Sequence, residues 1–288
     1  MTIIVNMACG LANRMFQYAY YIYLKDNGYN TLTDTYRHGK LAHETVQWND
    51  IFPKAQLQQA NKSLVWALGG GQDIVSRLRR KCPILSPQVL KMPSAFDAIP
   101  PTKKTQYIIG VFQNAEMVEK VQDKIFDIYQ FKPFLYDRNL KLEKEMEDCE
   151  SVAIHVRKGN DYQQRIWYQN TCNVNYYKKA VEYFGSRLKN PKFYVFTDNK
   201  SWVEDNFRFF GYKLVEGNPT SGYGSHFDMQ LMTHCRHNII SNSTYSWWGA
   251  FLNQHCEKMV IMPETWFNPN SCEEFTSRKL CCNGWISL

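Results

Sequence analysis

The sequence predicts an α/β protein that contains parallel sheets and is divided into two domains. The first observation is an alternation in the second half of the chain, where short apolar segments alternate with segments of helical spacing. The second is that the first half begins with the same order of strand, loop and helix. The third is size, because 288 residues exceed what one compact core usually requires. We therefore expect one domain over residues 1–150 and another over residues 151–288.

The strands expected in the second half are short and continuously apolar, which is typical of parallel strands buried on both faces. They are expected at residues 151–156, 192–196, 212–215, 238–241 and 258–262. Between them, apolar residues at helical spacing predict helices, at residues 177–188, 201–210, 226–235 and 244–254. This alternation predicts a parallel sheet with helices on both faces.

The first half contains fewer clear signals after its first helix. A strand is expected at residues 2–5, followed by a loop and by a helix at about residues 13–26. Asn27-Gly28 then offers a left-handed cap at the helix C-terminus. One further strand is clear at residues 107–112, and a charged helix at residues 140–150 leads into the second half.

The composition excludes several classes of protein. The chain is 44% hydrophobic with a mean hydropathy of −0.48, so it can bury a core and has no disordered-type composition. No run of about 18 apolar residues is present, and no basic region precedes the apolar N-terminal stretch, so we expect neither a membrane span nor a signal peptide. The nine cysteines are scattered without a C-x2-C pair, which indicates reduced thiols and a cytoplasmic location.

The net charge of +7 raises the question of nucleic acid. The charges are spread along both halves and are not interleaved with aromatic residues, so a nucleic-acid partner is not expected. The one true cluster is RLRRK at Arg77–Lys81. It fits a solvated face, and the alternative is peripheral docking to an anionic membrane surface or to a phosphate-bearing acceptor. No G-x-G-x-x-G motif follows a strand, which argues against a dinucleotide oxidoreductase.

The end of the strand at residues 151–156 carries the first candidate site. In parallel sheets, ligands bind beyond the carboxyl ends of the strands, where helix N-termini present unpaired N–H groups. His155 and Arg157 lie two positions apart, so they project to one side. An arginine close to Gly159, which lets backbone approach, is suited to bidentate binding of phosphate. The alternative is an arginine paired with a structural carboxylate and a histidine satisfied in the core.

The second candidate site is the polar turn Ser241, Asn242, Ser243 and Thr244, which ends one expected strand and begins the next helix. Hydroxyls, backbone N–H groups and the positive end of the helix dipole would converge there on an anion. An ordinary N-cap is the alternative for Ser243. In the preceding helix, Asp228 is either a surface acid or a carboxylate that accepts hydrogen bonds from N1–H and the exocyclic amine of guanine.

Three segments together resemble glycosyltransferase family 11, the α-1,2-fucosyltransferases, with similar spacing from end to end. They are GLANRMFQYA at residues 10–19, HVRKGNDY at residues 155–162 and DMQLMTHCRHNIISNSTYSWWGAFLN at residues 228–253. The resemblance implies a GT-B fold, in which two Rossmann-like domains face a cleft and the C-terminal domain holds most of GDP-fucose. It also implies an inverting transfer of L-fucose to the 2-hydroxyl of a β-galactoside-type acceptor, with no metal. The sequence contains no Asp-x-Asp motif, which metal-dependent nucleotide-sugar transferases usually have.

The resemblance also implies a role for each candidate residue. Arg157 would bind the β-phosphate and stabilise the departing GDP, with His155 near the guanosine or the diphosphate. Asp228 would contact the base. The phosphates would be bound by the polar turn, which comprises Ser241, Asn242, Ser243 and Thr244. The residues expected to close over the diphosphate and the acceptor from the N-terminal domain are Gly10, Asn13 and Arg14.

Asp161 is the candidate base for the acceptor hydroxyl, because it lies next to the phosphate site. Asp198 is the second candidate, and catalysis without a carboxylate base is the third option. Two segments differ from the family's usual pattern: Cys9–Arg14 replaces Gly-Gly-Leu-Gly-Asn-Gln, and Lys158 replaces the second arginine of His-Val-Arg-Arg-Gly-Asp-Tyr. The alternative functions are transfer from another GDP-sugar and sugar-nucleotide binding without turnover.

Overall fold

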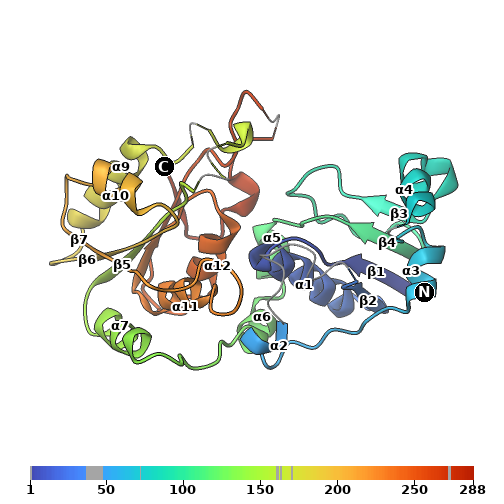
Figure 1. Cartoon of the computed structure of the whole chain (residues 1–288), viewed down its shortest axis with the longest axis horizontal. Helices are drawn as coiled ribbons and strands as arrows, with labels where there is room; N and C mark the ends of the chain where they lie inside the picture. Colours follow the sequence, from blue (N-terminus) through green and yellow to red (C-terminus); the bar gives the residue numbers. More distant parts are fainter. Residues whose placement is uncertain are drawn as a thin grey trace. The chain divides into compact units, whose positions relative to one another are not determined.

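The computed structural model of the chain describes residues 2–36, 48–71, 73–159, 162, 164–169, 171–271 and 274–288. The chain forms two compact units, Met1–Gln130 and Phe131–Leu288 (Figure 1). This division lies earlier than the boundary expected at residue 150. The reason is the charged helix α7 (Asp137–Glu147), which packs its buried Leu142 and Met146 into a core of the second unit.

The N-terminal unit contains a four-stranded parallel sheet in the order β2-β1-β4-β3. Its described strands are β1 (Thr2–Asn6), β2 (Thr31–Asp34), β3 (Val89–Lys91) and β4 (Thr105–Ile109). Its described helices are α1 (Leu11–Asp26), α2 (Trp48–Ile51), α3 (Lys62–Ala67), α4 (Ile74–Lys81), the 3-10 turn η2 (Pro83–Leu85), α5 (Ala115–Glu119) and α6 (Gln122–Ile128).

The helix α1 is buried along most of its length, and aromatic packing contributes much of this burial. The ring of Tyr18 has three aromatic neighbours at centroid distances of 5.4 to 5.9 Å, namely Tyr21, Trp48 and Tyr129. Such rings bury large areas and prefer tilted or offset contacts. The C-terminal cap predicted at Asn27-Gly28 is confirmed, because Gly28 has a φ of 81° and the Tyr29 N–H donates to the Leu24 carbonyl at 3.0 Å.

The C-terminal unit contains a six-stranded parallel sheet in the order β10-β9-β8-β5-β6-β7. Its described strands are β5 (Ser151–Val156), β6 (Lys192–Thr197), β7 (Tyr212–Leu214), β8 (His237–Ile239), β9 (Val260–Met262) and β10 (Ile286–Ser287). Besides α7, its described helices are η3 (Ile166–Tyr168), α9 (Val174–Gly185), α10 (Lys200–Asn206), α11 (Phe227–His234), α12 (Thr244–Leu252) and η4 (Arg278–Leu280).

Helices cover both faces of this sheet, as the continuously apolar strands predict (Figure 1). On β5, Val152 and Ile154 face a core that they share with α9 and α10. Ala153, which lies between them, faces the other core, together with Phe196 and the helices α7 and α11. Successive side chains of a strand point to opposite faces, so β5 and β6 contribute to both cores.

Some elements of the N-terminal unit differ from the prediction. The strand expected to reach residue 112 ends at Ile109, and Phe112 has a φ of 54°, which is incompatible with a strand. β2 was not expected because its sequence, TLTD, is mostly polar. Its Thr33 and Asp34 are nevertheless buried, and the Tyr107 hydroxyl donates a hydrogen bond to Asp34 Oδ2 at 2.5 Å. Among the described residues, no helix is both long enough and apolar enough to cross a membrane.

Candidate functional site

The strand order of the C-terminal unit changes direction between β5 and β8. From β5 the chain adds β6 and β7 on one side, and it then returns to add β8, β9 and β10 on the other side. The connections on the two sides leave the sheet in opposite directions at this point. Ligands of open α/β sheets bind in the crevice that results, beyond the carboxyl ends of the strands. The residues that follow β5 and β8 include most of the candidates that the sequence predicts.

His155 and Ser241 connect the ends of these two strands. His155 Nδ1 lies 2.8 Å from Ser241 Oγ, and both side chains are buried. Burial, reinforced by the positive charge of Arg157, lowers the pKa of His155 to about 3. The imidazole is therefore neutral at pH 7, with one N–H donor and one acceptor nitrogen. His155 is a satisfied buried histidine that holds the Ser241 hydroxyl at the strand edge.

Arg157 follows β5 and forms an ion pair with Asp198, which follows β6. Arg157 Nη1 lies 2.7 Å from Asp198 Oδ2, and 34% of the arginine side chain is exposed. The other carboxylate oxygen of Asp198 accepts a hydrogen bond from the Lys158 N–H at 2.7 Å. Because both of its oxygens are engaged, Asp198 is better placed to orient the guanidinium than to act as a base.

The side chain of Lys158 is engaged with its own unit. Its Nζ donates to the Thr171 carbonyl at 3.1 Å and lies 5.3 Å from the centroid of the Trp202 ring. Burial lowers the pKa of Lys158. The cation that replaces the second arginine of the family's usual motif thus stabilises the loop after β5.

The Asn242 side chain is held by four partners inside the C-terminal unit, one of which is the Cys172 thiol at 3.3 Å. Its Nδ2 donates to the Thr171 hydroxyl at 2.9 Å and to the Trp266 carbonyl at 2.8 Å. Its Oδ1 accepts a hydrogen bond from the Tyr162 hydroxyl. The buried side chain fixes the shape of the polar turn, and the expected role of Asn242 in phosphate binding stays a prediction.

The helix α12 begins at Thr244 without a side-chain cap. Ser243 occupies the N-cap position with an extended backbone, yet its side chain accepts no hydrogen bond from the first turn. In contrast, α9 and α10 are capped by Asn173 and Asn199. The first N–H groups of a helix lack intrahelical partners and carry partial positive charge, so an anion stabilises them. Ser243 is therefore not an ordinary N-cap, and the first turn of α12 keeps the geometry of an anion site.

Asp228 lies in the first turn of α11 and is oriented by Asn218. Asn218 Nδ2 donates to Asp228 Oδ1 at 2.8 Å, and Asn218 Oδ1 accepts a hydrogen bond from Arg138 Nη2 at 2.9 Å. Burial raises the pKa of Asp228 to about 6, although Asn218 and Arg138 both act to lower it. Asp228 is therefore not an ordinary surface acid. A partner with N–H donors would stabilise its charged form.

Tyr245 connects Asp228 with the strand-end residues. Its hydroxyl accepts a hydrogen bond from the Met229 N–H at 2.8 Å, which fixes the first turns of α11 and α12 against each other. Its ring centroid lies 5.7 Å from that of His155. Burial raises the pKa of Tyr245, the charge of Asp228 adds to this effect, and the charge of Arg157 opposes it. Asp228, Arg157 and His155 thus form a cluster around Tyr245.

The N-terminal unit places Gly10, Asn13 and Arg14 at the start of α1. Gly10 is the N-cap residue, and Asn13 Oδ1 accepts a hydrogen bond from Gln113 Nε2 at 3.1 Å. The Arg14 side chain is 1% exposed, and its guanidinium carbon lies 5.9 Å from the centroid of the Trp48 ring. Arg14 therefore lies within its own unit, not on the surface of that unit.

The loop before α1 keeps a glycine-like backbone although the family's usual glycine is absent. Cys9 has a φ of 76°, a left-handed conformation that costs a residue with a Cβ roughly 1–2 kcal/mol. Gln17 stabilises this loop, because its Oε1 accepts from the Ala8 N–H at 2.9 Å while its Nε2 donates to the Gly110 carbonyl at 2.9 Å. Cys9 thus adopts the left-handed backbone that glycine adopts without strain.

Asp161 and Asn218 are the remaining residues of the candidate site. Asp161, the candidate base, lies outside the described residues, so its role stays a prediction. Asn218 was not predicted, because the Gly-Asn-Pro segment that contains it reads only as a turn. Gly217 allows Arg138 to approach this segment closely. Its φ is 84°, and a Cβ there would lie 2.1 Å from Arg138 Nη1.

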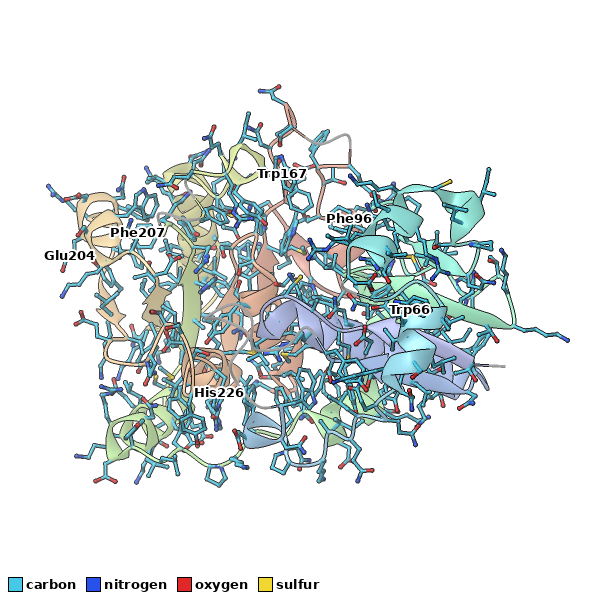
Figure 2. All side chains as sticks on the ribbon, turned by 45° about the vertical axis from the view of Figure 1, so that its right-hand side comes forward. Trp66, Phe96, Trp167, Glu204, Phe207 and His226 are labelled. Carbon is cyan, nitrogen blue, oxygen red and sulfur yellow. The ribbon has the colours of Figure 1, made fainter. Side chains whose placement is uncertain are left out.

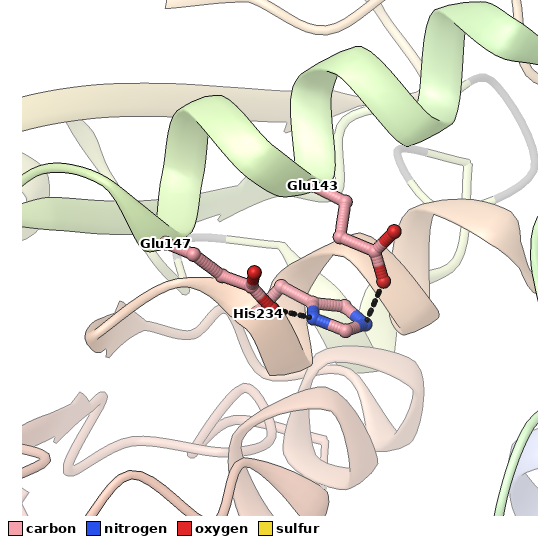
Figure 3. Close-up of side chains that lie close together, drawn as sticks. All are labelled: Glu143, Glu147 and His234. Atoms are coloured by element: carbon pink, nitrogen blue, oxygen red, sulfur yellow. Dashed lines mark hydrogen bonds and ion pairs between the residues drawn. The ribbon is translucent and has the colours of Figure 1, made fainter.

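One group of side chains in the described part of the chain has the composition of a metal site. Glu143 and Glu147 of α7 lie close to His234 of α11 (Figure 3). His234 Nδ1 lies 2.9 Å from Glu147 Oε1, and His234 Nε2 lies 3.1 Å from Glu143 Oε1. Each ring nitrogen thus faces a carboxylate oxygen, and the three side chains link the helices α7 and α11. The group lies at the opposite end of α11 from Asp228.

The fold and the site define the class of protein. Two α/β units with parallel sheets, the second with an anion-binding geometry at its strand ends, are characteristic of GT-B glycosyltransferases. The structure of the α-1,6-fucosyltransferase NodZ soaked with GDP-fucose covers 87% of this chain and 92% of its own, with a TM-score of 0.53 at 14% identity. The structure of NodZ from Bradyrhizobium gives a TM-score of 0.51 at 13% identity, covering 86% and 91%. These matches establish the fold.

The chain belongs to glycosyl transferase family 11, whose model matches residues 91–288. It is 31% identical over 188 residues to the O-antigen biosynthesis glycosyltransferase WbnK of Escherichia coli, covering 63% of this chain and 60% of that protein. It is 30% identical over 189 residues to an alpha-1,2-colitosyltransferase of Escherichia coli, covering 62% and 61%. It is 29% identical over 110 residues to galactoside alpha-(1,2)-fucosyltransferase 2 of Mus musculus, covering 35% and 30%. The matched segments thus span less than two thirds of each relative.

Proposed function

We propose that this family 11 glycosyltransferase transfers L-fucose from GDP-fucose to the 2-hydroxyl of a β-galactoside-type glycan, with inversion and without a metal ion. The observation that carries the proposal is the cluster around Tyr245. It places a guanidinium, a helix N-terminus without a side-chain cap and a half-buried carboxylate at the switch point of one parallel sheet. These three features match the diphosphate and the guanine of a GDP-sugar.

In the proposed reaction, the bond between the sugar C1 and the β-phosphate oxygen breaks while the acceptor oxygen bonds to C1. Negative charge develops on the departing phosphate. Arg157, held by Asp198, and the first N–H groups of α12 are fixed donors that stabilise this charge. We assign the proton of the acceptor hydroxyl to Asp161, next to the phosphate site. We assign to Gly10 and Asn13 the contacts that the N-terminal unit makes, while the buried Arg14 supports the start of α1.

The relatives support an α-1,2 linkage, and they differ in the sugar that they transfer. They include a galactoside α-1,2-fucosyltransferase and an α-1,2-colitosyltransferase. Both names specify a transfer to position 2, which supports that part of the proposal. A donor with another sugar is the alternative function, and the colitosyl relative favours it. The cytoplasmic location belongs to the proposal as well, because it rests on the cysteine pattern of the sequence.

Nucleotide binding and transfer are tested separately. We expect GDP to raise the melting temperature by on the order of 5 °C at about 100 times its Kd, equally with and without EDTA, whereas UDP should have little effect. Incubation with GDP-fucose and a β-galactoside should release GDP and give a 2-linked product. Stabilisation by GDP without release would indicate a binding protein. Selective stabilisation by UDP, or a requirement for Mg²⁺, would refute the proposal.

A further inference from the structure

The helix α4 turns its apolar residues towards solvent. Ile74, Val75 and Leu78 are 74%, 56% and 59% exposed. The buried face of the helix is polar, because Ser76 is 0% exposed and its hydroxyl donates to the N-cap residue Asp73 at 2.6 Å. At about 100° per residue, the three apolar side chains form one continuous stripe. This orientation is the reverse of that in an ordinary surface helix of a globular unit.

Neighbouring residues extend the stripe to a larger apolar surface, which we call the α4 patch. It consists of Trp66, Ile74, Val75, Leu78, Ile84 and Leu85, all more than half exposed. Arg79 of α4 contacts two of the neighbouring residues. Its guanidinium carbon lies 5.7 Å from the centroid of the Trp66 ring, and its Nε donates to the Leu85 carbonyl at 3.4 Å. Trp66 is labelled on α3 in Figure 2. Clustered exposed apolar side chains of this kind mark an interaction surface.

The patch lies in the basic part of the chain. Residues 54–104 contain nine Lys or Arg and two Asp, a net charge of +7. The whole chain contains 34 basic and 27 acidic residues, so 25 of each remain outside this segment. The expectation of charges spread along both halves is therefore corrected, because the entire net charge lies in this segment. On α4, Arg77 and Lys81 are exposed beside the apolar stripe, four residues apart and hence on one side of the helix.

We propose that the α4 patch docks the enzyme on an anionic membrane surface. Apolar side chains that enter the boundary of a bilayer, flanked by Lys and Arg that contact anionic headgroups, are the pattern of interfacial helices. A second copy of the chain would bring two surfaces of the same positive charge together. The charge of the patch therefore favours a lipid surface. This proposal does not depend on which sugar the enzyme transfers.

The test is sedimentation of the full-length chain with lipid vesicles. We expect binding to vesicles of phosphatidylcholine with about 30% phosphatidylglycerol and at least about tenfold weaker binding to phosphatidylcholine alone. Raising the salt from about 0.05 M to about 0.5 M should also weaken binding, because exposed charges are then screened. Equal binding to both types of vesicle, or to neither, would overturn the proposal.

Two variants separate the apolar and basic contributions. Ile74→Ser/Leu78→Ser/Ile84→Ser and Arg77→Glu/Lys81→Glu should each reduce the partition coefficient at least about tenfold. Matched controls in the other unit are Leu135→Ser and Lys178→Glu/Lys179→Glu, which replace residues that are exposed as well and should leave binding unchanged. Circular dichroism and melting temperature verify the fold of each variant. Unchanged binding of both patch variants to the vesicles would refute docking of the α4 patch on a lipid surface. A dimer in sedimentation velocity that the apolar substitutions dissociate would also refute it, because the patch would then be a contact between two copies of the chain.

Discussion

At the scale of single residues, the burial of Asp228 makes the stability of the protein depend on pH and on a bound ligand. Its folded pKa of about 6 lies above the usual 3.8, because burial disfavours the carboxylate. A raised carboxyl pKa contributes stability that is present below pH 3.8 and is lost as the pH rises through 6. At neutral pH the ionised Asp228 therefore costs stability in the free enzyme. A ligand with N–H donors, such as guanine, offsets this cost.

The pKa of Asp228 predicts that the preference for GDP over IDP depends on pH. IDP keeps the diphosphate and N1–H but lacks the exocyclic amine. Above pH 6 we expect GDP to bind about 10- to 100-fold more tightly, as for a hydrogen bond to a charged group. Below pH 6 the preference should diminish, because protonated Asp228 is a weaker acceptor. Titration calorimetry at several pH values measures the ratio of the dissociation constants of IDP and GDP. Because both ligands carry the same diphosphate, the ionisation of the phosphates cancels in this ratio.

Asp228→Asn is the matched variant for this experiment. It keeps one acceptor oxygen but presents an NH2 group to the guanine amine, so the GDP preference should be small at every pH. Glu204→Gln, an exposed change on α10, should leave the preference intact. The N–H donors of the bound base lower the pKa of Asp228, so the pH range must extend below 6. A preference that stays constant from pH 4 to pH 8 in the unaltered protein would contradict a contact between Asp228 and the base.

For Arg157 we predict a loss of catalysis with a retained fold. Arg157→Ala removes a fixed donor from the departing phosphate and should reduce kcat by on the order of 10²- to 10³-fold. The side chain is one-third exposed, so the variant should still fold. Initial rates with saturating GDP-fucose measure the effect. Arg208→Ala, which removes an arginine from an exposed ion pair, is the control. Near-normal turnover of Arg157→Ala would exclude the phosphate role.

The positions of these residues could be predicted, but their partners could not. His155, Arg157 and the polar turn follow strands, and sequence order alone places them at the same sheet edge. The contact between Arg157 and Asp198 depends on β6 pairing beside β5, which a single sequence does not specify. The same holds for Asn242, because its partners Thr171 and Trp266 come from separate loops.

At the scale of elements, the close contact between α11 and α12 positions the site. Tyr245 and Asp228 lie in the first turns of the two helices. Gly249 in α12 allows the close approach, because a Cβ there would lie 3.0 Å from Met232 Cβ and 3.1 Å from Met232 Sδ. The tightly packed pair fixes both N-termini at the same sheet edge.

Gly249→Val should therefore destabilise the enzyme by about 1–3 kcal/mol through overpacking. Because the helices would have to separate, GDP should also stabilise the variant less than it stabilises the unaltered enzyme. Urea unfolding with and without GDP measures both effects. Gly185→Val at the end of α9 is the control, since a Cβ at Gly185 meets no atom within 4 Å. A Gly249→Val variant as stable as this control would show that the contact tolerates a larger side chain.

The helices and strands of the second half were predictable because each is strongly apolar and regularly spaced. All five strands expected there are confirmed, with ends that shift by a few residues. β2, β3 and β10 were missed, since the first is polar and the other two contain only Val89–Lys91 and Ile286–Ser287. Such strands are specified by pairing with a neighbour, and pairing is a tertiary property.

At the scale of the whole molecule, each unit has a core of its own. The C-terminal unit buries two clusters, one on each face of its sheet, and the N-terminal unit buries a separate one. A unit with its own core can fold independently. The cluster around Tyr245 lies wholly within the C-terminal unit.

A chain of residues 131–288 should therefore fold alone and still bind GDP. We expect its melting temperature to rise with GDP by an amount similar to that of the full-length enzyme. Transfer should be lost, because the proposal places acceptor contacts in the N-terminal unit. Differential scanning fluorimetry of both proteins is the measurement, with residues 1–130 as the control that should not respond. A folded C-terminal unit whose melting temperature does not rise with GDP would mean that nucleotide binding requires both units.

The hydrogen bond between His155 and Ser241 spans 86 positions of the chain. During synthesis, the ribosome must therefore add β6, β7, α11 and β8 after β5 before the two ends can meet. Contacts so distant in sequence are slow to form, because a long loop has to close first. The nascent chain thus passes through a period in which β5, β6 and β7 are present but β9, β10 and the proposed nucleotide site are not. A messenger truncated before codon 241 would yield a protein that cannot gain stability from GDP, however well its first strands have formed.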